Sequence, residues 1–377
     1  MDQIITEQSP SDNLDKNETE LNPKFDDNIF NRDISPEAIA SHIEDLNKNI
    51  STKDSLFLVR SAAQCIEDAK KRPIPRMLFG EFWYEGEICI LFADTNLGKS
   101  ILAVQIANSI SSGTPIHKFK LESSPQKVLY FDFELSDKQF EARYSNDFSS
   151  HFIFDPHFLR AEINPDISAP EVSNSSSEDF LYRSLEDVII NTGARILIVD
   201  NITYLRRETE HAKEALPLMK YLKSIKAKYN LSILALAHTP KRDLAKPITR
   251  NDLQGSKMLI NFCDSAFAIG ESTQDGQTRY LKQIKARNTE IIYDTENVCT
   301  CQISKPDNFL KLGFLKYDTE REHLKQISDT DRDEKISEAK KLNSQGFSNV
   351  EIAKQFGVSE GAIRKWFKKT DTKDENK

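Results

Sequence analysis

Four short, mostly apolar runs, three of them followed by a stretch with helical spacing, most constrain the fold of this 377-residue chain. A strand with one wet face alternates apolar and polar residues, so uniformly apolar runs indicate strands covered on both faces. Strands that alternate with helices predict a parallel sheet in an α/β domain, here residues 51–320. The four runs are 88–93, 127–133, 194–200 and 231–237, and further strands are predicted at 264–269 and 278–285.

Charge is distributed unevenly along the chain. The net charge is −8, and residues 1–54 alone hold 13 acidic and 5 basic side chains. We therefore interpret residues 1–50 as an acidic, largely disordered arm. The remainder sums to zero, and residues 340–370 carry 7 basic against 2 acidic side chains. The acidic total thus does not argue against a nucleic-acid partner for the rest of the chain.

Composition also bears on location and cysteine chemistry. No apolar run approaches the roughly 18 residues of a membrane-spanning helix, and the first residues lack a signal-peptide pattern. We expect no membrane association and a cytoplasmic protein. The five cysteines are scattered without a CxxC pair, which argues against a disulfide scaffold or zinc ribbon. Cys299 and Cys301 share a strand face in this interpretation and are expected to be buried thiols.

The segment after the first apolar run approaches the phosphate-loop pattern G-x-x-x-x-G-K-[ST], in which backbone N–H groups and a helix N-terminus hold phosphates. A chance Gly-Lys-Ser at a helix start is the alternative. The first glycine of the pattern is replaced by alanine, which is acceptable with a negative φ, and an asparagine stands where many such loops have glycine. The predicted nucleotide-binding residues are Ala93, Asp94, Thr95, Asn96, Leu97, Gly98, Lys99 and Ser100.

Two carboxylates follow later strands at the edge where open α/β sheets bind ligands. Asp200 ends the third run, where a carboxylate can hold Mg²⁺ together with Ser100. Glu134 follows the second run, where it can act as the general base for water. Asp132 is its rival, because residues 132 and 134 share a strand face. We favour Glu134, which lies at the exit of the strand.

Together these residues resemble the RecA-like ATPases, in particular the branch of plasmid RepA and the DnaB-type hexameric helicases. The resemblance covers residues 75–320 and includes the runs GEFWYEGEICILFADTNLGKSILAVQIANSI and LYFDFELSDKQFEARY. It implies ATP and Mg²⁺ as cofactors, Glu134 as the catalytic glutamate and Asp200 as the magnesium aspartate. His238 matches the family's polar sensor of the γ-phosphate, and Gln254-Gly255-Ser256 resembles the Gly-Ser that closes its nucleic-acid loop.

The segment 285–288 resembles the family's K-x-R-N, which reaches into a neighbouring subunit's nucleotide. Cations at Lys285 and Arg287 are two residues apart, so on a strand both can reach one anion and stabilise charge on a transferring phosphoryl group. The resemblance therefore implies a homo-oligomer, such as a hexameric ring. Two solvated cations on an edge strand are the alternative.

A basic loop occupies residues 239–257. Two prolines and a glycine predict irregular structure, and cations without aromatic residues would contact the phosphates of a single DNA strand rather than stack on bases. An ordinary solvated loop is the alternative. The candidate DNA-binding cations are Lys241, Arg242, Lys246, Arg250 and Lys257.

The C-terminal region predicts a second small domain. After a linker at 321–333, residues 334–370 read as three short helices before a disordered tail at 371–377. Ser348 and Glu351 form a capping-box pattern, and the whole resembles a helix-turn-helix of the resolvase and transposase type. In that motif the second helix of the pair enters the major groove of duplex DNA. Its candidate contacts are Arg364, Lys365 and Lys368, with a protein-binding helical bundle as the alternative.

The sequence thus predicts a RecA-like α/β ATPase with a C-terminal helix-turn-helix. The favoured function is a DNA-associated ATPase, similar to the RepA-type helicases and replication proteins of plasmids and mobile elements. One alternative is a DNA-binding regulator that uses its nucleotide as a switch without hydrolysis. Another is a helicase loader or recombination accessory ATPase.

Overall fold

The structure is a computed structural model, and it describes residues 35, 37, 38, 41, 57–167, 177–205, 215–240, 242–253, 256–326 and 329–374. The chain divides into two compact units, 1–74 and 75–377. The predicted acidic arm at 1–50 lies almost entirely outside the described residues. The compact unit that holds the sheet begins at Pro75, whereas the predicted domain starts at residue 51.

In the first unit the structure describes the nine-residue helix α2 (Ala62–Lys70). Its N-terminus is capped by the Ser61 side chain, which accepts a hydrogen bond from the Gln64 N–H. No side chain of α2 is buried. Helix α2 therefore lacks the buried apolar face that holds most helices of globular domains.

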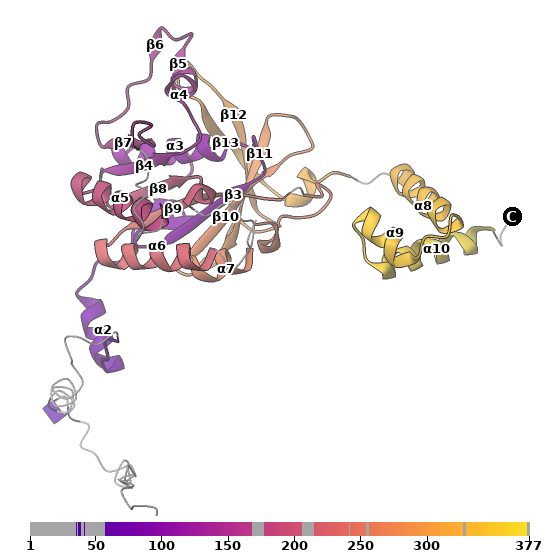
Figure 1. The fold of residues 1–377 in the computed structure, drawn as a ribbon, viewed down its shortest axis with the longest axis horizontal. Helices are drawn as coiled ribbons and strands as arrows, with labels where there is room; N and C mark the ends of the chain where they lie inside the picture. Colours follow the sequence, from indigo (N-terminus) through magenta and orange to yellow (C-terminus); the bar gives the residue numbers. More distant parts are fainter. Residues whose placement is uncertain are drawn as a thin grey trace, which may run out of the picture. The chain divides into compact units, whose positions relative to one another are not determined.

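The second unit is built on a nine-stranded sheet (Figure 1). Its order is β13-β12-β11-β10-β3-β9-β8-β4-β7, parallel from β10 to β7 and antiparallel from β10 to β13. The strands are β3 (Ile88–Ala93), β4 (Val128–Asp132), β7 (Phe158–Ala161), β8 (Ile196–Asp200), β9 (Ser232–His238), β10 (Ser265–Glu271), β11 (Thr278–Lys285), β12 (Val298–Ser304) and β13 (Lys311–Asp318). The mostly parallel sheet, with the predicted phosphate loop after its central strand β3, confirms the predicted α/β fold.

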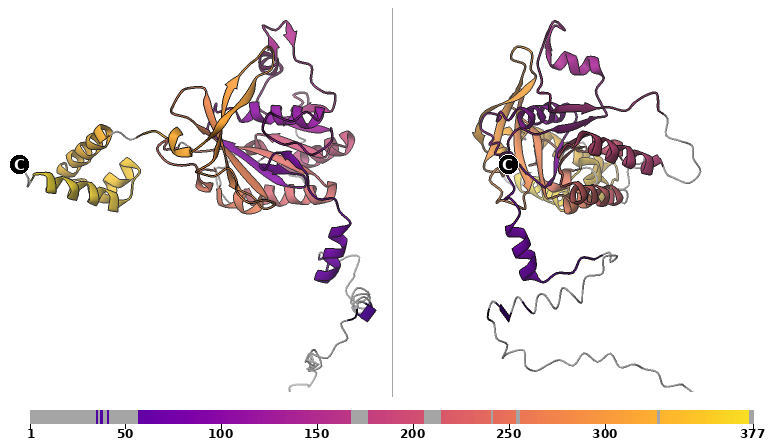
Figure 2. Two further views of the ribbon diagram at one scale, coloured as in Figure 1. Left: turned by 180° about the vertical axis from the view of Figure 1, so that it is seen from behind. Right: turned by 90° about the vertical axis from the view of Figure 1, so that its left-hand side faces the viewer.

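Helices cover both faces of this sheet (Figure 2). Alternate residues of β3 enter different cores: Ile88, Ile90 and Phe92 pack with the helices of one face, and Cys89 and Leu91 with those of the other. This is why the run is apolar throughout. One face carries α5 (Ser177–Thr192), α6 (Ala215–Tyr229) and α7 (Ser256–Phe262), and the other carries α3 (Lys99–Ser112).

Smaller elements surround the sheet. A hairpin packs near α3, and another follows the short helix after β4. The first hairpin consists of β1 (Met77–Phe79) and β2 (Trp83–Tyr84), and the second, after α4 (Asp137–Arg143), of β5 (Ser145–Asn146) and β6 (Ser150–His151). The 3-10 helices are η2 (Ile202–Leu205), η4 (Arg250–Asp252) and η5 (Glu320–His323).

The predicted linker at 321–333 is wrong in its first residues. The 3-10 helix η5 belongs to the sheet domain, because Glu320 and His323 are fully buried there. Glu320 forms an ion pair with Lys282 of β11 at 2.5 Å. His323 therefore belongs to the core although it was assigned to the linker, and Glu320, the last residue of the predicted domain, is paired there.

The C-terminal residues form three helices, α8 (Asp329–Ser344), α9 (Asn349–Phe356) and α10 (Glu360–Asp374). They pack around Ala339, Ile352, Ala353 and Ile363. The predicted capping box of Ser348 and Glu351 is present. Helix α8 begins before the expected domain start at 334, and α10 continues to Asp374, beyond the predicted domain end at 370 and into the expected tail. Among the described residues, no helix combines the length and apolar character needed to cross a membrane.

Candidate nucleotide site

The predicted phosphate loop lies between the end of β3 and the start of α3. Asn96 and Gly98 both adopt left-handed backbone angles, with φ of 63° and 94°. Ala93 is the last residue of β3 and is not among the residues with positive φ. The two departures from glycine are therefore compatible with the loop, because asparagine tolerates the left-handed region and Ala93 does not enter it.

Gly98 also satisfies a packing requirement. A Cβ atom built there would lie 3.2 Å from Cδ1 of Ile303 and 3.3 Å from Cδ1 of Leu312. Both the backbone angle and the neighbouring side chains of β12 and β13 thus favour glycine at the N-cap of α3. The helix begins immediately after it, so its free N–H groups and positive dipole end face the loop.

Lys99 lies inside the loop, 7% exposed. Its Nζ donates to the carbonyl oxygens of Ala93 and Asp94, each at 3.1 Å, and lies 3.2 Å from Nδ1 of His238. Burial lowers the pKa of Lys99, while the charges of Asp200, Glu134 and Asp94 oppose that shift. An ammonium group held only by backbone carbonyls and a histidine is available to exchange these partners for phosphate oxygens.

Asp200 ends β8 and is 1% exposed. Its Oδ2 accepts a hydrogen bond from the Tyr130 hydroxyl at 2.6 Å, whereas its buried Oδ1 has no hydrogen-bond partner among the described residues. Burial raises the pKa of Asp200 to about 6, and hydrogen bonding by Ser100 and Tyr130 opposes this shift. A buried carboxylate oxygen beside the Ser100 hydroxyl fits an Mg²⁺ site, in which the metal arrives with the nucleotide.

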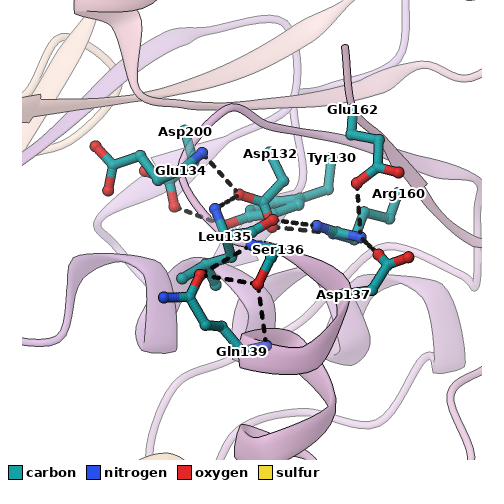
Figure 3. Close-up of polar contacts among 10 residues, drawn as sticks. All are labelled: Tyr130, Asp132, Glu134, Leu135, Ser136, Asp137, Gln139, Arg160, Glu162 and Asp200. Atoms are coloured by element: carbon teal, nitrogen blue, oxygen red, sulfur yellow. Dashed lines mark hydrogen bonds and ion pairs between the residues drawn. The ribbon is translucent and has the colours of Figure 1, made fainter. Parts of the chain in front are cut away.

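Glu134 lies just beyond β4 and is directed to the same edge (Figure 3). Its Oε1 accepts a hydrogen bond from Nδ2 of Asn201 at 2.9 Å and lies 3.4 Å from Nε2 of His238. Hydrogen bonding from His238 lowers the pKa of Glu134 to about 2, with further lowering from Asn201 and Lys99. Its side chain is 40% exposed. The group is therefore an ionised, solvent-accessible base next to the phosphate loop.

The rival carboxylate Asp132 has a different environment. Its side chain is fully buried and both of its oxygens are occupied within the chain. Oδ2 pairs with the Arg160 guanidinium at 2.9 Å, and Oδ1 accepts the backbone N–H groups of Glu134 and Leu135. Strand alternation alone did not separate the two carboxylates, but their partners do: Glu134 is accessible to a ligand and Asp132 is not.

Lys285 and Arg287 lie at the end of the sheet away from the phosphate loop, near the N-terminal ends of the parallel strands. Lys285 pairs in register with Ala266 at the start of β10, whereas the phosphate loop follows the end of β3. The Lys285 Nζ donates to the carbonyls of Ile260 and Cys263, and Arg287 pairs with Asp264 at 3.0 Å. The two cations therefore do not face the phosphate loop of their own chain, so the predicted role requires a second subunit.

The basic loop is held more firmly than its sequence suggests. Arg242 is not a free cation, because its side chain is 6% exposed, lies 3.5 Å from Asp252 and donates to the carbonyl of Lys246. The structure therefore contradicts the prediction that Arg242 contacts DNA. Lys246 and Arg250 are exposed. Lys241, Gln254, Gly255 and the side chains of Ser256 and Lys257 lie outside what the structure describes.

On α10, Arg364 and Lys365 are exposed as predicted. Arg364 donates to Glu360 at 2.6 Å, one helical turn earlier. Trp366 is half-buried, with its ring 6.0 Å from that of Phe356, so it belongs to the helical core. The side chain of Lys368 lies outside the described residues.

Three further residues contribute to the site and were not predicted. Asn201 hydrogen-bonds Glu134, Tyr130 hydrogen-bonds Asp200, and Arg160 pairs with Asp132. Asn201 could have been predicted as a site residue, because it directly follows Asp200 and the carboxyl ends of parallel strands meet at one side of the sheet. Arg160 gave no such signal, since its four-residue strand β7 was not predicted.

Comparison with known proteins found one family match and similar solved structures. The model of the AAA domain family matches residues 57–243. This match supports a P-loop NTPase domain in that part of the chain. Among solved structures, the KaiC-like protein PH0186 from Pyrococcus horikoshii OT3 is similar, with 13% identity, a TM-score of 0.44, and 64% of this chain and 99% of that chain covered. No curated protein matches the chain.

Proposed function

We propose that this chain is a DNA-associated ATPase that acts as a RepA-like helicase or replication protein of a plasmid or mobile element. The observation that carries the proposal is the contact chain Lys99–His238–Glu134–Asn201, next to the buried Asp200 at one edge of the sheet. A phosphate-binding cation, an ionised base and a candidate magnesium carboxylate are the parts that nucleotide hydrolysis needs.

In this proposal Ser100 and Asp200 hold Mg²⁺, which would neutralise charge on the phosphates of ATP. The loop N–H groups and Lys99 bind the phosphates. Glu134 orients the attacking water and accepts its proton, and His238 together with Asn201 fixes the orientation of the carboxylate. Lys285 and Arg287 of a neighbouring copy complete the site, which makes a homo-oligomer part of the proposal.

DNA is the proposed partner at two places. The exposed Lys246 and Arg250 of the 239–257 loop contact the phosphates of a single strand. The three C-terminal helices act as a helix-turn-helix on duplex DNA, with Arg364, Lys365 and Lys368 on the helix that enters the major groove. What supports this is the three-helix core with its capping box and the exposed cations of α10.

The test compares ATP hydrolysis and ATP binding in wild type and Glu134→Gln, with and without single-stranded DNA. The proposal expects Glu134→Gln to bind ATP normally and to lose about 100-fold or more in turnover, the usual contribution of a general base. Equal, DNA-independent behaviour of both proteins would favour a nucleotide-switched regulator. Turnover without unwinding of a forked duplex would favour a loader or recombination accessory ATPase.

A further inference from the structure

Arg160 of β7 makes an unusually complete set of contacts with the segment that carries Glu134 (Figure 3). Its Nε donates to Asp132 Oδ2 at 2.9 Å, its Nη2 to the carbonyl of Leu135 at 2.5 Å and its Nη1 to Asp137 Oδ1 at 2.5 Å. Nη1 also lies 3.3 Å from Glu162. The guanidinium therefore holds the segment 132–137 at its beginning, middle and end.

Asp132 links the Arg160 guanidinium to the backbone of Glu134. Its Oδ1 accepts the backbone N–H groups of Glu134 at 3.2 Å and of Leu135 at 2.9 Å. The Asp132 side chain is fully buried, and Arg160 is the cation paired with it. A buried carboxylate deprived of its cation is strongly destabilised. Without Arg160, Asp132 would gain a proton or turn toward water, and the two N–H groups would no longer have a charged acceptor.

The turn between β4 and α4 is thereby fixed on both sides. After Glu134, the Ser136 side chain and Gln139 form a capping box that starts α4. Arg160 also lies over the ring of Phe140, 5.1 Å from its centroid, which joins the guanidinium to the body of that helix. Between these fixed points, Glu134 projects toward His238 and Asn201.

We propose that Arg160 is a positioning residue for Glu134, acting through the Asp132 carboxylate. The inference rests on the proposed function, in which Glu134 is the general base. Arg160 itself does not touch the reacting atoms; it fixes the backbone from which the Glu134 carboxylate is presented. A displacement of about 1 Å in a catalytic group can cost roughly 100-fold in rate. Loss of Arg160 therefore reduces kcat without removing any group that binds ATP.

The experiment measures kcat, KM and ATP affinity for Arg160→Gln, Arg160→Lys and Asp132→Asn in the full chain. We expect Arg160→Gln and Asp132→Asn to lower kcat about 10- to 100-fold with KM and affinity within about 2-fold. Arg160→Lys keeps the charge but not the planar fork, so it restores only part of kcat. Two controls stay at wild-type kcat: Glu162→Gln, which removes an exposed partner of the same guanidinium, and Arg76→Gln, which breaks the Arg–Glu pair with Glu85 elsewhere.

A double-mutant cycle separates positioning from general damage. Arg160→Gln is expected to have no further effect on kcat in a Glu134→Gln background, since the group it positions is already disabled. Amide hydrogen exchange of nucleotide-free protein should also be faster at residues 133–136 in Arg160→Gln and unchanged in Glu162→Gln.

Three results overturn the inference: additive losses in the cycle, unchanged exchange at 133–136, or loss of ATP affinity with kcat retained. Wild-type turnover in Glu134→Gln would instead overturn the proposed function, and the inference with it. Loss of turnover in Glu134→Gln but not in Arg160→Gln overturns the inference alone.

Discussion

At the scale of single residues, the phosphate loop shows which departures from glycine matter physically. Asn96 occupies a left-handed position that glycine fills at less cost, whereas Ala93 is an ordinary strand residue, 1% exposed and paired with His238 of β9 and Ile269 of β10. Its carbonyl accepts from the Lys99 Nζ and from the N–H of Thr239. The alanine thus supports the site through its backbone, and its methyl group packs in the core.

The variant Ala93→Gly, which restores the usual loop glycine, should therefore bring no gain in function. Glycine inside a strand loses more backbone entropy on folding, so the free energy of unfolding should fall by about 0.5–1 kcal/mol. Denaturant unfolding and ATP affinity measured on the same protein check this. An affinity at least 10-fold tighter than wild type would show that Ala93 obstructs the nucleotide and would contradict the account.

At the scale of elements, the basic loop and the end of the sheet are joined by one buried ion pair. Lys282 of β11 donates to Glu320 and to the carbonyl of Ile248, while Glu320 accepts the Ile248 N–H at 2.7 Å. Further along, the N–H of Lys325 donates to the carbonyl of Leu244. The segment that follows β13 therefore fixes the first half of the loop proposed to contact DNA.

Glu320→Gln should accordingly be strongly destabilising, because it leaves the Lys282 ammonium buried without its counter-charge. Removing one partner of such a pair costs about 3–5 kcal/mol. The exposed pair of Lys246 and Asp243, at 3.4 Å, provides a control, and Lys246→Ala should change the free energy of unfolding by less than about 1 kcal/mol. Urea unfolding of both variants makes the comparison. Equal effects would mean that Glu320 is not paired inside the core.

The same elements show how far sequence reasoning reached. Strands β3 and β11 were predicted with their observed bounds, because the apolar residues of each strand and the loop residues that flank it determine the bounds locally. The short edge strand β7, which pairs with β4 about 30 residues earlier, was not predicted. The hairpin strands β12 and β13 were not placed either, because polar residues interrupt their apolar pattern. The position of Glu134 was predictable from the strand exit, but the separate role of Asp132 depends on Arg160, 28 residues away. The burial of Glu320 was likewise hidden, because its partner Lys282 comes from another strand.

At the scale of the whole chain, charge is separated between an acidic N-terminal region and a basic C-terminal one. The structure describes the C-terminal region as a small domain with its own core. Its exposed cations lie on more than one helix, including Lys340 and Lys341 on α8 as well as Arg364 and Lys365 on α10. The proposed function assigns duplex DNA binding to α10 alone. Removing cations from α10 or from α8 therefore distinguishes specific docking from general electrostatic attraction.

Duplex binding should therefore weaken more in the double variant Arg364→Ala/Lys365→Ala than in the charge-matched Lys340→Ala/Lys341→Ala. Each cation removed from a DNA phosphate reduces the slope of log affinity against log salt by about 0.9, so the first variant should reduce the slope by up to about 2. ATP turnover without DNA should stay unchanged in both. Equal reductions of affinity in the two variants would contradict a specific role for α10.

The most direct test of the central claim is steady-state ATP hydrolysis by wild type and Lys99→Ala, each with and without single-stranded DNA. Lys99 is the cation of the phosphate loop, and its Nζ is joined to Glu134 through His238. The account predicts turnover in wild type that rises with DNA and is abolished in Lys99→Ala. No turnover in wild type, under conditions where ATP binding is demonstrated, would contradict it and identify the nucleotide as a switch.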